Sequence, residues 1–274
     1  MQKDIFLPLC LGSNWVVFLH IPMPNETKRR RYSRNIALTE IGEQGQEALN
    51  DTKVLIVGAG GLGSPVILYL AAAGIGNIGI VDKDRVDISN LQRQIIYNEE
   101  DIGRPKAQIA AQRASALNPY IKPTFYPDNL NKSNASSIIK NYDIVADCSD
   151  NFQTRFIVNE YCYQLQKPLI SGAVTGFSGH IATFKSYLGG QYPCYRCFCP
   201  QLPPEDLLPN CLSGGVLGSV TGVIGSLQAT EIIKEALGKG KDLSQNIIIY
   251  EGLTTNFRKI SLKKDPACEL CVEV

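Results

Sequence analysis

The sequence predicts an α/β fold: a Rossmann-like, doubly wound, mainly parallel sheet with a mixed or antiparallel C-terminal extension. From Lys53 onward, short β-rich runs alternate with helical stretches, which is typical of parallel strands joined by right-handed crossovers. A glycine-rich turn joins the first of these strands to the first helix. Apolar residues make up 44% and charged residues 19% of the 274 residues, so the chain can bury a large core.

The individual elements follow in order along the chain. Strands are predicted at 54–57, 78–81, 121–125 and 142–146, and helices at 64–74, 105–117, 133–140 and from about 152. Pro65 near the start of the first helix and Gly74 just past its end show the asymmetry expected of helix termini. In the second half, strands are predicted at 179–185, 247–250 and 257–262, and a helix at 219–237.

The expected domain organisation is one large domain with an N-terminal segment. Residues 1–26 do not match the alternation, and no role is assigned to them. Residues 27–274 are expected to form a single domain, with a core at about 50–172 and an elaboration at about 173–274.

Composition excludes several classes of partner. Lys and Arg total 27 against 26 for Asp and Glu, so no overall charge selects nucleic acid or an anionic membrane. The longest apolar stretch, Trp15–Ile21, is much shorter than the ~20 residues of a membrane-spanning helix. The start of the chain also lacks the pattern of a signal peptide. We therefore expect a cytoplasmic protein that binds neither nucleic acid nor membrane.

A glycine loop indicates nucleotide binding. Gly58, Gly60 and Gly63 satisfy G-x-G-x-x-G, with Gly61 between them, directly after a strand and before a helix. Such a turn brings backbone N–H groups and a helix N-terminus close to phosphates. Asp82 ends the next strand, where an acid that binds ribose hydroxyls is expected. Taken alone, these features favour an NAD(P)- or FAD-dependent oxidoreductase.

The residues after Asp82 favour ATP instead. The arm comprises Ser89, Asn90, Leu91, Gln92 and Arg93, and Lys106 follows at a helix start. A triphosphate under attack carries more charge than a dinucleotide and benefits from fixed cations such as Arg93 and Lys106. For either cation alone, a surface ion pair is an equal alternative.

Acidic residues follow the strand predicted at 142–146. Asp147 and Asp150 therefore lie at the carboxyl end of the sheet, where such folds bind ligands. A carboxylate there can hold Mg²⁺ against phosphates. The alternative is that Asp150 or Asn151 only caps the next helix, and both roles can coexist.

The cysteines near the end of the chain have metal-ligand spacing. Cys194 and Cys197 form one C-x2-C pair, and Cys268 and Cys271 form another. Four thiolates in such pairs enclose a structural Zn²⁺ tetrahedrally, and buried free thiols are the alternative. Cys199 is not included among the ligands.

These motifs occur in one order, and together they resemble the ThiF/MoeB/HesA family of E1-like enzymes, the sulfur-carrier adenylyltransferases. The resemblance covers roughly Arg31 to Cys271. It implies that the C-terminal Gly-Gly carboxylate of a ubiquitin-like sulfur carrier protein attacks the α-phosphorus of Mg-ATP, releasing pyrophosphate and forming an acyl-adenylate. It assigns Gly61, Asp82, Ser89–Arg93, Lys106, Asp150 and Asn151 to the nucleotide, and the four paired cysteines to zinc.

The resemblance also implies partners. Arg34 matches an arginine that a partner subunit contributes to the ATP site, which implies a homodimer with composite sites. Cys211 lies where the family often carries a cysteine that links covalently to the carrier; a small buried hydrophobe is the alternative. The sequence stops soon after the last cysteine pair, so we expect a separate sulfur donor. The carrier could belong to the molybdopterin (molybdenum cofactor) or the thiamine pathway.

Two rival functions are weighed against adenylation. An oxidoreductase would use the same glycine loop but has no need for the cysteine pairs. A catalytically idle carrier-binding scaffold would not need Arg34, Arg93, Lys106 and Asp150 together.

Overall fold

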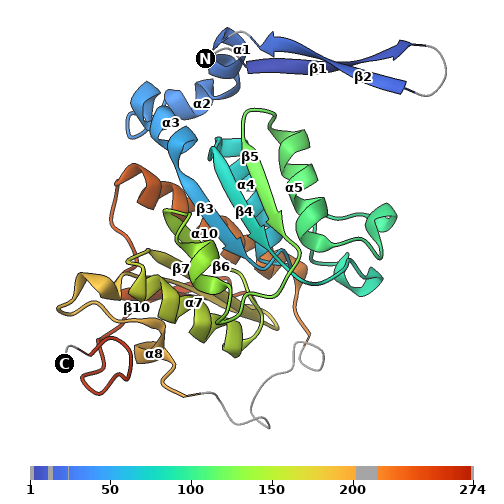
Figure 1. The fold of residues 1–274 in the computed structure, drawn as a ribbon. Coiled ribbons are helices and arrows are strands. Elements are labelled where there is room, and N and C mark those ends of the chain that lie inside the picture. The colour runs from blue at the N-terminus through green and yellow to red at the C-terminus, as the bar shows by residue number, and fades with distance from the viewer. Residues whose placement is uncertain (1–2, 12–14, 24, 202–214, 273–274) are drawn as a thin grey trace. The chain divides into compact units, whose positions relative to one another are not determined.

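The computed structural model describes residues 3–11, 15–23, 25–201 and 215–272, with side chains described from Glu26 onward. The chain divides into two compact units, Met1–Glu47 and Ala48–Val274 (Figure 1). Among the described residues, no helix combines the length and the apolar character needed to cross a bilayer.

The first unit contains a hairpin and short helices. Strands β1 (Lys3–Leu11) and β2 (Trp15–Met23) pair antiparallel, with Lys3 opposite Met23. Helices α1 (Asn25–Arg31) and α2 (Ser33–Ile36) follow, and α3 (Gly42–Asp51) leads into the second unit. The Arg29 guanidinium lies 2.7 Å from the Glu43 carboxylate, so an exposed ion pair connects α1 to the start of α3.

The second unit is built on one eight-stranded sheet in the order β10-β9-β8-β7-β6-β3-β4-β5 (Figure 1). Its strands are β3 (Lys53–Val57), β4 (Asn77–Val81), β5 (Lys122–Tyr126), β6 (Ile144–Asp147), β7 (Leu169–Thr175), β8 (Ser178–Phe184), β9 (Asn246–Glu251) and β10 (Asn256–Ser261). Strands β3 to β7 pair in parallel, and β8 to β10 extend the sheet antiparallel. This confirms the predicted fold class, including its antiparallel extension.

Helices cover both faces of this sheet. They are α4 (Gly63–Ala73), α5 (Lys106–Leu117), α6 (Ala135–Ile139), α7 (Phe152–Gln164), α8 (Tyr195–Phe198) and α10 (Gly218–Leu237), with 3-10 turns η1 (Ile88–Asn90), η2 (Glu99–Asp101) and η3 (Ser186–Leu188). Ile56 of β3 packs in the core cluster of α4, α5 and α10, whereas its neighbour Leu55 packs in the cluster of α6 and α7. Because side chains alternate across a strand, β3 is buried on both faces.

The order of the strands determines where a ligand can bind. The chain runs from β3 through β4 to β5 on one side and then returns to β6 on the other. Val57 at the end of β3 is opposite Val81 of β4 and Asp147 of β6. The carboxyl ends of all three strands therefore meet at one edge, at the point where strand order reverses, and doubly wound sheets bind ligands there.

Candidate active site

A cavity of about 550 Å³ lies at this edge of the sheet. Most of the residues predicted to bind the nucleotide line it: Gly58, Gly60, Gly61, Asp82, Arg93, Lys106, Asp150 and Asn151. The sequence therefore pointed to residues from five separate segments of the chain that line one cavity.

The glycine loop needs glycine for both conformation and space. Gly58 has a φ of +97°, in the left-handed region, and a Cβ there would lie 2.7 Å from the carbonyl oxygen of Cys148. A Cβ on Gly63 would lie 2.1 Å from the carbonyl oxygen of Gly58. A side chain at Gly58 would push the loop away from the Cys148 backbone, and a side chain at Gly63 would force the loop itself open.

The same loop presents unused hydrogen-bond donors. Within the described residues, no acceptor takes a hydrogen bond from the N–H groups of Gly60, Gly61 or Leu62. They precede the first turn of α4, where the helix dipole adds partial positive charge. Gly60 and Gly61 line the cavity, so this arrangement can bind phosphate oxygens.

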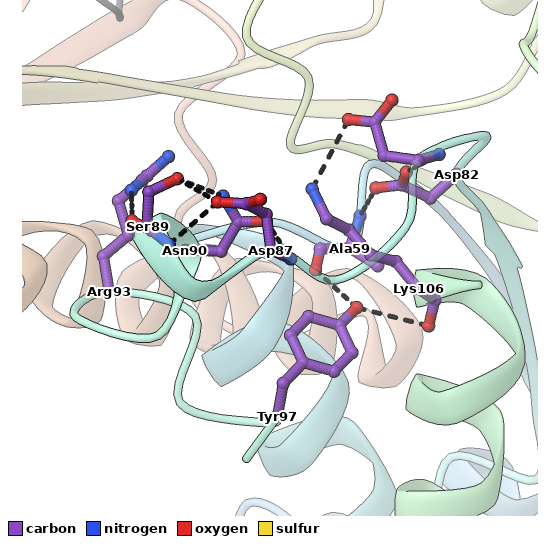
Figure 2. A network of polar contacts seen from close by, with 9 residues as sticks. Ala59, Asp82, Asp87, Ser89, Asn90, Arg93, Tyr97 and Lys106 are labelled. Carbon is purple, nitrogen blue, oxygen red and sulfur yellow. Dashed lines mark hydrogen bonds and ion pairs between the residues drawn. The ribbon is translucent and has the colours of Figure 1, made fainter. Parts of the chain in front are cut away.

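Asp82 connects the glycine loop to the end of β4. Its carboxylate accepts hydrogen bonds from the N–H of Ala59 and the N–H of Asp84, both over 2.8 Å (Figure 2). Burial raises the pKa of the Asp82 carboxyl above its ordinary value, while the two N–H groups act in the opposite direction. The residue lines the cavity and also fixes the loop beside it.

The arm holds its arginine through a compact turn. Asp87 caps η1 by accepting hydrogen bonds from the N–H and the hydroxyl of Ser89, over 2.9 Å and 2.6 Å. Arg93 donates from Nη1 to the Ser89 carbonyl over 2.9 Å (Figure 2). Arg93 lines the cavity, whereas Ser89, Asn90, Leu91 and Gln92 are outside its wall. In this structure, those four residues form or follow the turn that holds Arg93.

Lys106 is a cation in an otherwise buried position. It is 6% exposed at the first position of α5, and its Nζ lies 3.4 Å from a carboxylate oxygen of Asp84. Asp84 is itself exposed. An ammonium has three donors, and among the described residues Asp84 accepts one of them, so the Lys106 ammonium keeps donors for a phosphate.

The two predicted acids have different surroundings. Asp147 is 1% exposed and accepts hydrogen bonds from Ser149 and Ser171, so its role is structural. Asp150 is exposed in the cavity wall and is the carboxylate available to a ligand. Asn151 caps α7 by accepting a hydrogen bond from the Thr154 N–H over 2.9 Å, and it also lines the cavity.

The far half of the cavity was not predicted. It is lined by Arg155, Ala173, Val174, His180, Tyr195, Phe198, Ile247 and Ile249, from α7, β7, β8, α8 and β9. Arg155 is 6% exposed and donates to the carbonyl of Ser149. Burial and the nearby Arg155 lower the pKa of His180 to about 4, so its imidazole is neutral at pH 7. One or two residues on each of five elements leave no motif by which the sequence could reveal this half.

The four paired cysteines lie together. Their sulfur atoms are all within 4.8 Å of one another, which confirms the predicted grouping. The closest sulfur–sulfur distances are 3.4 Å for Cys197–Cys271, 3.6 Å for Cys194–Cys268 and 3.9 Å for Cys194–Cys197. A tetrahedron with zinc–sulfur bonds of about 2.3 Å places its sulfurs about 3.8 Å apart. The cluster therefore fits a structural zinc ion.

Two predicted residues are outside this description of the cavity. Arg34 is exposed and belongs to the first compact unit. Cys211 lies outside the described residues. Cys199, which was not assigned a role, is half-buried and lines the cavity.

Comparisons with known proteins agree with this geometry. The sequence profile of the ThiF family matches residues 32–270. A sulfur carrier protein adenylyltransferase of Thermus thermophilus is 45% identical over 243 residues, covering 88% of this chain and 90% of that protein. The adenylyltransferase and sulfurtransferase MOCS3 of Danio rerio is 44% identical over 89% of this chain. This chain covers 52% of that relative, about half its length.

Solved structures share the fold. E. coli MccB, crystallised with ATP, superposes with a TM-score of 0.76 at 25% identity, covering 92% of this chain and 77% of that one. PaaA superposes with a TM-score of 0.74 at 19% identity, covering 94% and 79%, and this likeness concerns the fold alone.

Proposed function

The chain belongs to the ThiF family, and on this premise we propose that it is an ATP-dependent adenylyltransferase acting on a ubiquitin-like sulfur carrier protein. The observation that supports this most is the cavity that combines free N–H groups of the glycine loop with Arg93, Lys106 and Asp150. A dinucleotide enzyme has no need of that cation and carboxylate set. The Thermus thermophilus relative carries the same activity in its name.

The reaction is an in-line displacement on the α-phosphorus of ATP. The C-terminal Gly-Gly carboxylate of the carrier attacks, the bond to the β-phosphate oxygen breaks, and pyrophosphate leaves. The carboxylate is ionised at neutral pH, so the reaction needs no general base. This agrees with a cavity whose histidine, His180, is neutral and lies in the far half.

The fixed charges of the cavity stabilise the transition state. The N–H groups of Gly60 and Gly61 bind phosphate oxygens, and Arg93 and Lys106 offset the charge that develops on the leaving pyrophosphate. Asp82 binds the ribose hydroxyls, and Asn151 lies beside the nucleotide. Asp150, exposed in the wall, holds Mg²⁺, which neutralises the phosphates.

The zinc ion has a structural role. Cys194 caps the start of α8 and Cys197 lies within this helix, while Cys268 and Cys271 come from the last described turn of the chain. Zinc in this cluster supplies a cross-link between distant segments. The cysteines are compatible with a reducing compartment, so the proposal places the protein in the cytoplasm.

The active protein is a homodimer with composite sites. This part of the proposal is supported by the family resemblance at Arg34 and by the exposure of that residue in its own unit. Arg34 of one subunit reaches the triphosphate bound by the other. The Cys211 thiolate attacks the carbonyl carbon of the acyl-adenylate, so that the bond to AMP breaks, AMP leaves and a thioester links Cys211 to the carrier. A separate donor supplies sulfur, and the carrier belongs to the molybdopterin or thiamine pathway.

Carrier-dependent exchange of labelled pyrophosphate into ATP tests the proposal. The protein is incubated with ATP, Mg²⁺ and candidate carriers, and a carrier lacking its terminal Gly-Gly serves as the matched control. Exchange with the intact carrier alone is expected. If no Gly-Gly carrier supports exchange and the protein binds NAD tightly, the result supports the oxidoreductase. If no carrier supports exchange and the protein binds ATP but not NAD, the result supports the scaffold.

A further inference from the structure

Ala59 is held at both of its main-chain polar groups, its N–H and its carbonyl. Its N–H donates to the Asp82 carboxylate over 2.8 Å, and its carbonyl accepts a hydrogen bond from the Tyr97 hydroxyl, also over 2.8 Å. Figure 2 shows both contacts on opposite sides of the loop. The residue between the first two glycines of the loop therefore cannot rotate without losing one of these bonds.

The Tyr97 hydroxyl has a second neighbour. It lies 3.2 Å from the carbonyl oxygen of Lys106, the first residue of α5 (Figure 2). Tyr97 is 7% exposed and does not line the cavity. Burial, together with the carboxylate of Asp82, raises the pKa of Tyr97 above its ordinary value, so the hydroxyl keeps its proton and remains a donor.

Backbone geometry connects this hydroxyl to the phosphate-binding groups. A trans peptide is planar, so the N–H of Gly60 points opposite to the Ala59 carbonyl. That carbonyl faces Tyr97, away from the cavity, while Gly60 lines the cavity and its N–H has no acceptor among the described residues. Holding the Ala59 carbonyl therefore aims the Gly60 N–H toward the ligand space.

We propose that Tyr97 is a positioning residue for the triphosphate. Its one hydroxyl holds the glycine loop and the start of α5 in the arrangement in which the Gly60 N–H and the Lys106 ammonium bind the same polyphosphate. Because it fixes donors before the ligand arrives, it reduces the cost of ordering them on binding. The inference rests on the ATP-binding part of the proposed function and adds a residue that does not touch ATP itself.

The test compares Tyr97→Phe with a matched control, Tyr142→Phe. Tyr142 is also buried, and its hydroxyl lies 3.0 Å from that of Tyr126, outside the cavity wall. Each substitution removes one oxygen from a buried ring. The affinity for α,β-methylene-ATP with Mg²⁺ is measured by calorimetry. The affinity for adenosine is measured on the same sample, by calorimetric titration in which the ATP analogue displaces bound adenosine. Unfolded material lowers the stoichiometry of binding and leaves both affinities unchanged.

In Tyr97→Phe, the affinity for the ATP analogue is expected to fall about tenfold or more, because the Ala59 carbonyl loses its donor and the link to the Lys106 carbonyl is lost with it. The affinity for adenosine, which has no phosphate, is expected to change less than about twofold, and Tyr142→Phe to leave both affinities unchanged. An unchanged ratio of the two affinities in Tyr97→Phe overturns the inference, even if the variant unfolds at a lower temperature. A parent protein that binds the ATP analogue but exchanges no pyrophosphate would overturn adenylation alone.

Discussion

Ser171 on β7 donates a hydrogen bond from its Oγ to the Oδ2 of Asp147, at the end of the neighbouring strand β6, over 2.9 Å. Asp147 also lies 3.9 Å from Nη1 of the buried Arg155. The carboxylate thus joins two strands and a helix. Asp150 follows on the same loop but is exposed, so the two acids have different tasks.

Asp147→Ala and Asp150→Ala should therefore separate stability from activity. Removing Asp147 leaves Arg155 buried without its counter-ion, and we expect the free energy of unfolding to fall by about 3–5 kcal/mol. Asp150→Ala should change it by less than about 0.5 kcal/mol and reduce pyrophosphate exchange at least about 100-fold. Urea unfolding measures the free energy of unfolding of each variant, and the pyrophosphate exchange assay measures its activity. Normal exchange in Asp150→Ala would show that the metal-binding role is misassigned.

The purified protein should contain zinc in a one-to-one ratio. In the double variant Cys268→Ser, Cys271→Ser, half of the predicted ligands are lost, and we expect the metal to be absent. Cys199→Ser is the matched control because this thiol lies close by in sequence but outside the four-cysteine cluster. Elemental analysis measures the zinc content of the parent protein, the double variant and Cys199→Ser. A parent without zinc, or zinc lost in Cys199→Ser, contradicts the assignment.

His180 should make the protein less stable in acid. Its pKa is lowered from 6.5 to about 4 in the folded protein, so between these values the unfolded chain binds the extra proton. The free energy of unfolding should therefore decrease as pH falls from about 6.5 to about 4. At pH 5.0 we expect His180 to cost about 1–2 kcal/mol relative to pH 7.5.

His180→Gln should remove this part of the pH dependence. The carboxylates titrate in both proteins, so the difference between parent and variant isolates the histidine. Urea unfolding at pH 7.5 and 5.0 measures it. Identical losses of stability in the two proteins would mean that the imidazole is already solvated in the folded state.

Mixing two inactive variants tests the composite site. Arg34→Ala and Arg93→Ala should each abolish exchange while leaving the fold intact. After equal amounts are mixed and subunits re-exchanged, a mixed dimer combines one intact Arg93 with Arg34 of the partner, so about a quarter of all sites should be active. Exchange that stays absent in a mixture shown to contain mixed dimers contradicts a shared site. An Arg34→Ala protein that still exchanges pyrophosphate would also contradict a shared site.

The sequence revealed the elements whose signals are local. The strand–glycine loop–helix unit and the two cysteine pairs depend on short, regular spacings, and both were located correctly. Strand β7 was missed because Ser171 and Gly172 weaken the β pattern, and pairing with β6 and β8 determines its position. The hairpin of β1 and β2 was missed too, since Pro8 and Pro22 argue against strands.

The sequence could not reveal residues that act through distant parts of the chain. Tyr97 has no motif of its own, and its role depends on Ala59 and Lys106 approaching it in the folded protein. Likewise, the predicted strand 142–146 is observed at Ile144–Asp147, because Tyr142 turns instead to meet Tyr126. Such contacts follow from packing and not from residue periodicity.

The four-cysteine cluster has a consequence for the order in which the protein is completed during synthesis. Helix α8 carries Tyr195 and Phe198, which line the cavity and are next in sequence to the ligand cysteines Cys194 and Cys197. Their partners Cys268 and Cys271 leave the ribosome much later. The cavity wall can therefore be locked only after the sheet and the nucleotide loop have had time to form. A nascent chain would acquire its phosphate-binding elements first and the far half of its cavity last.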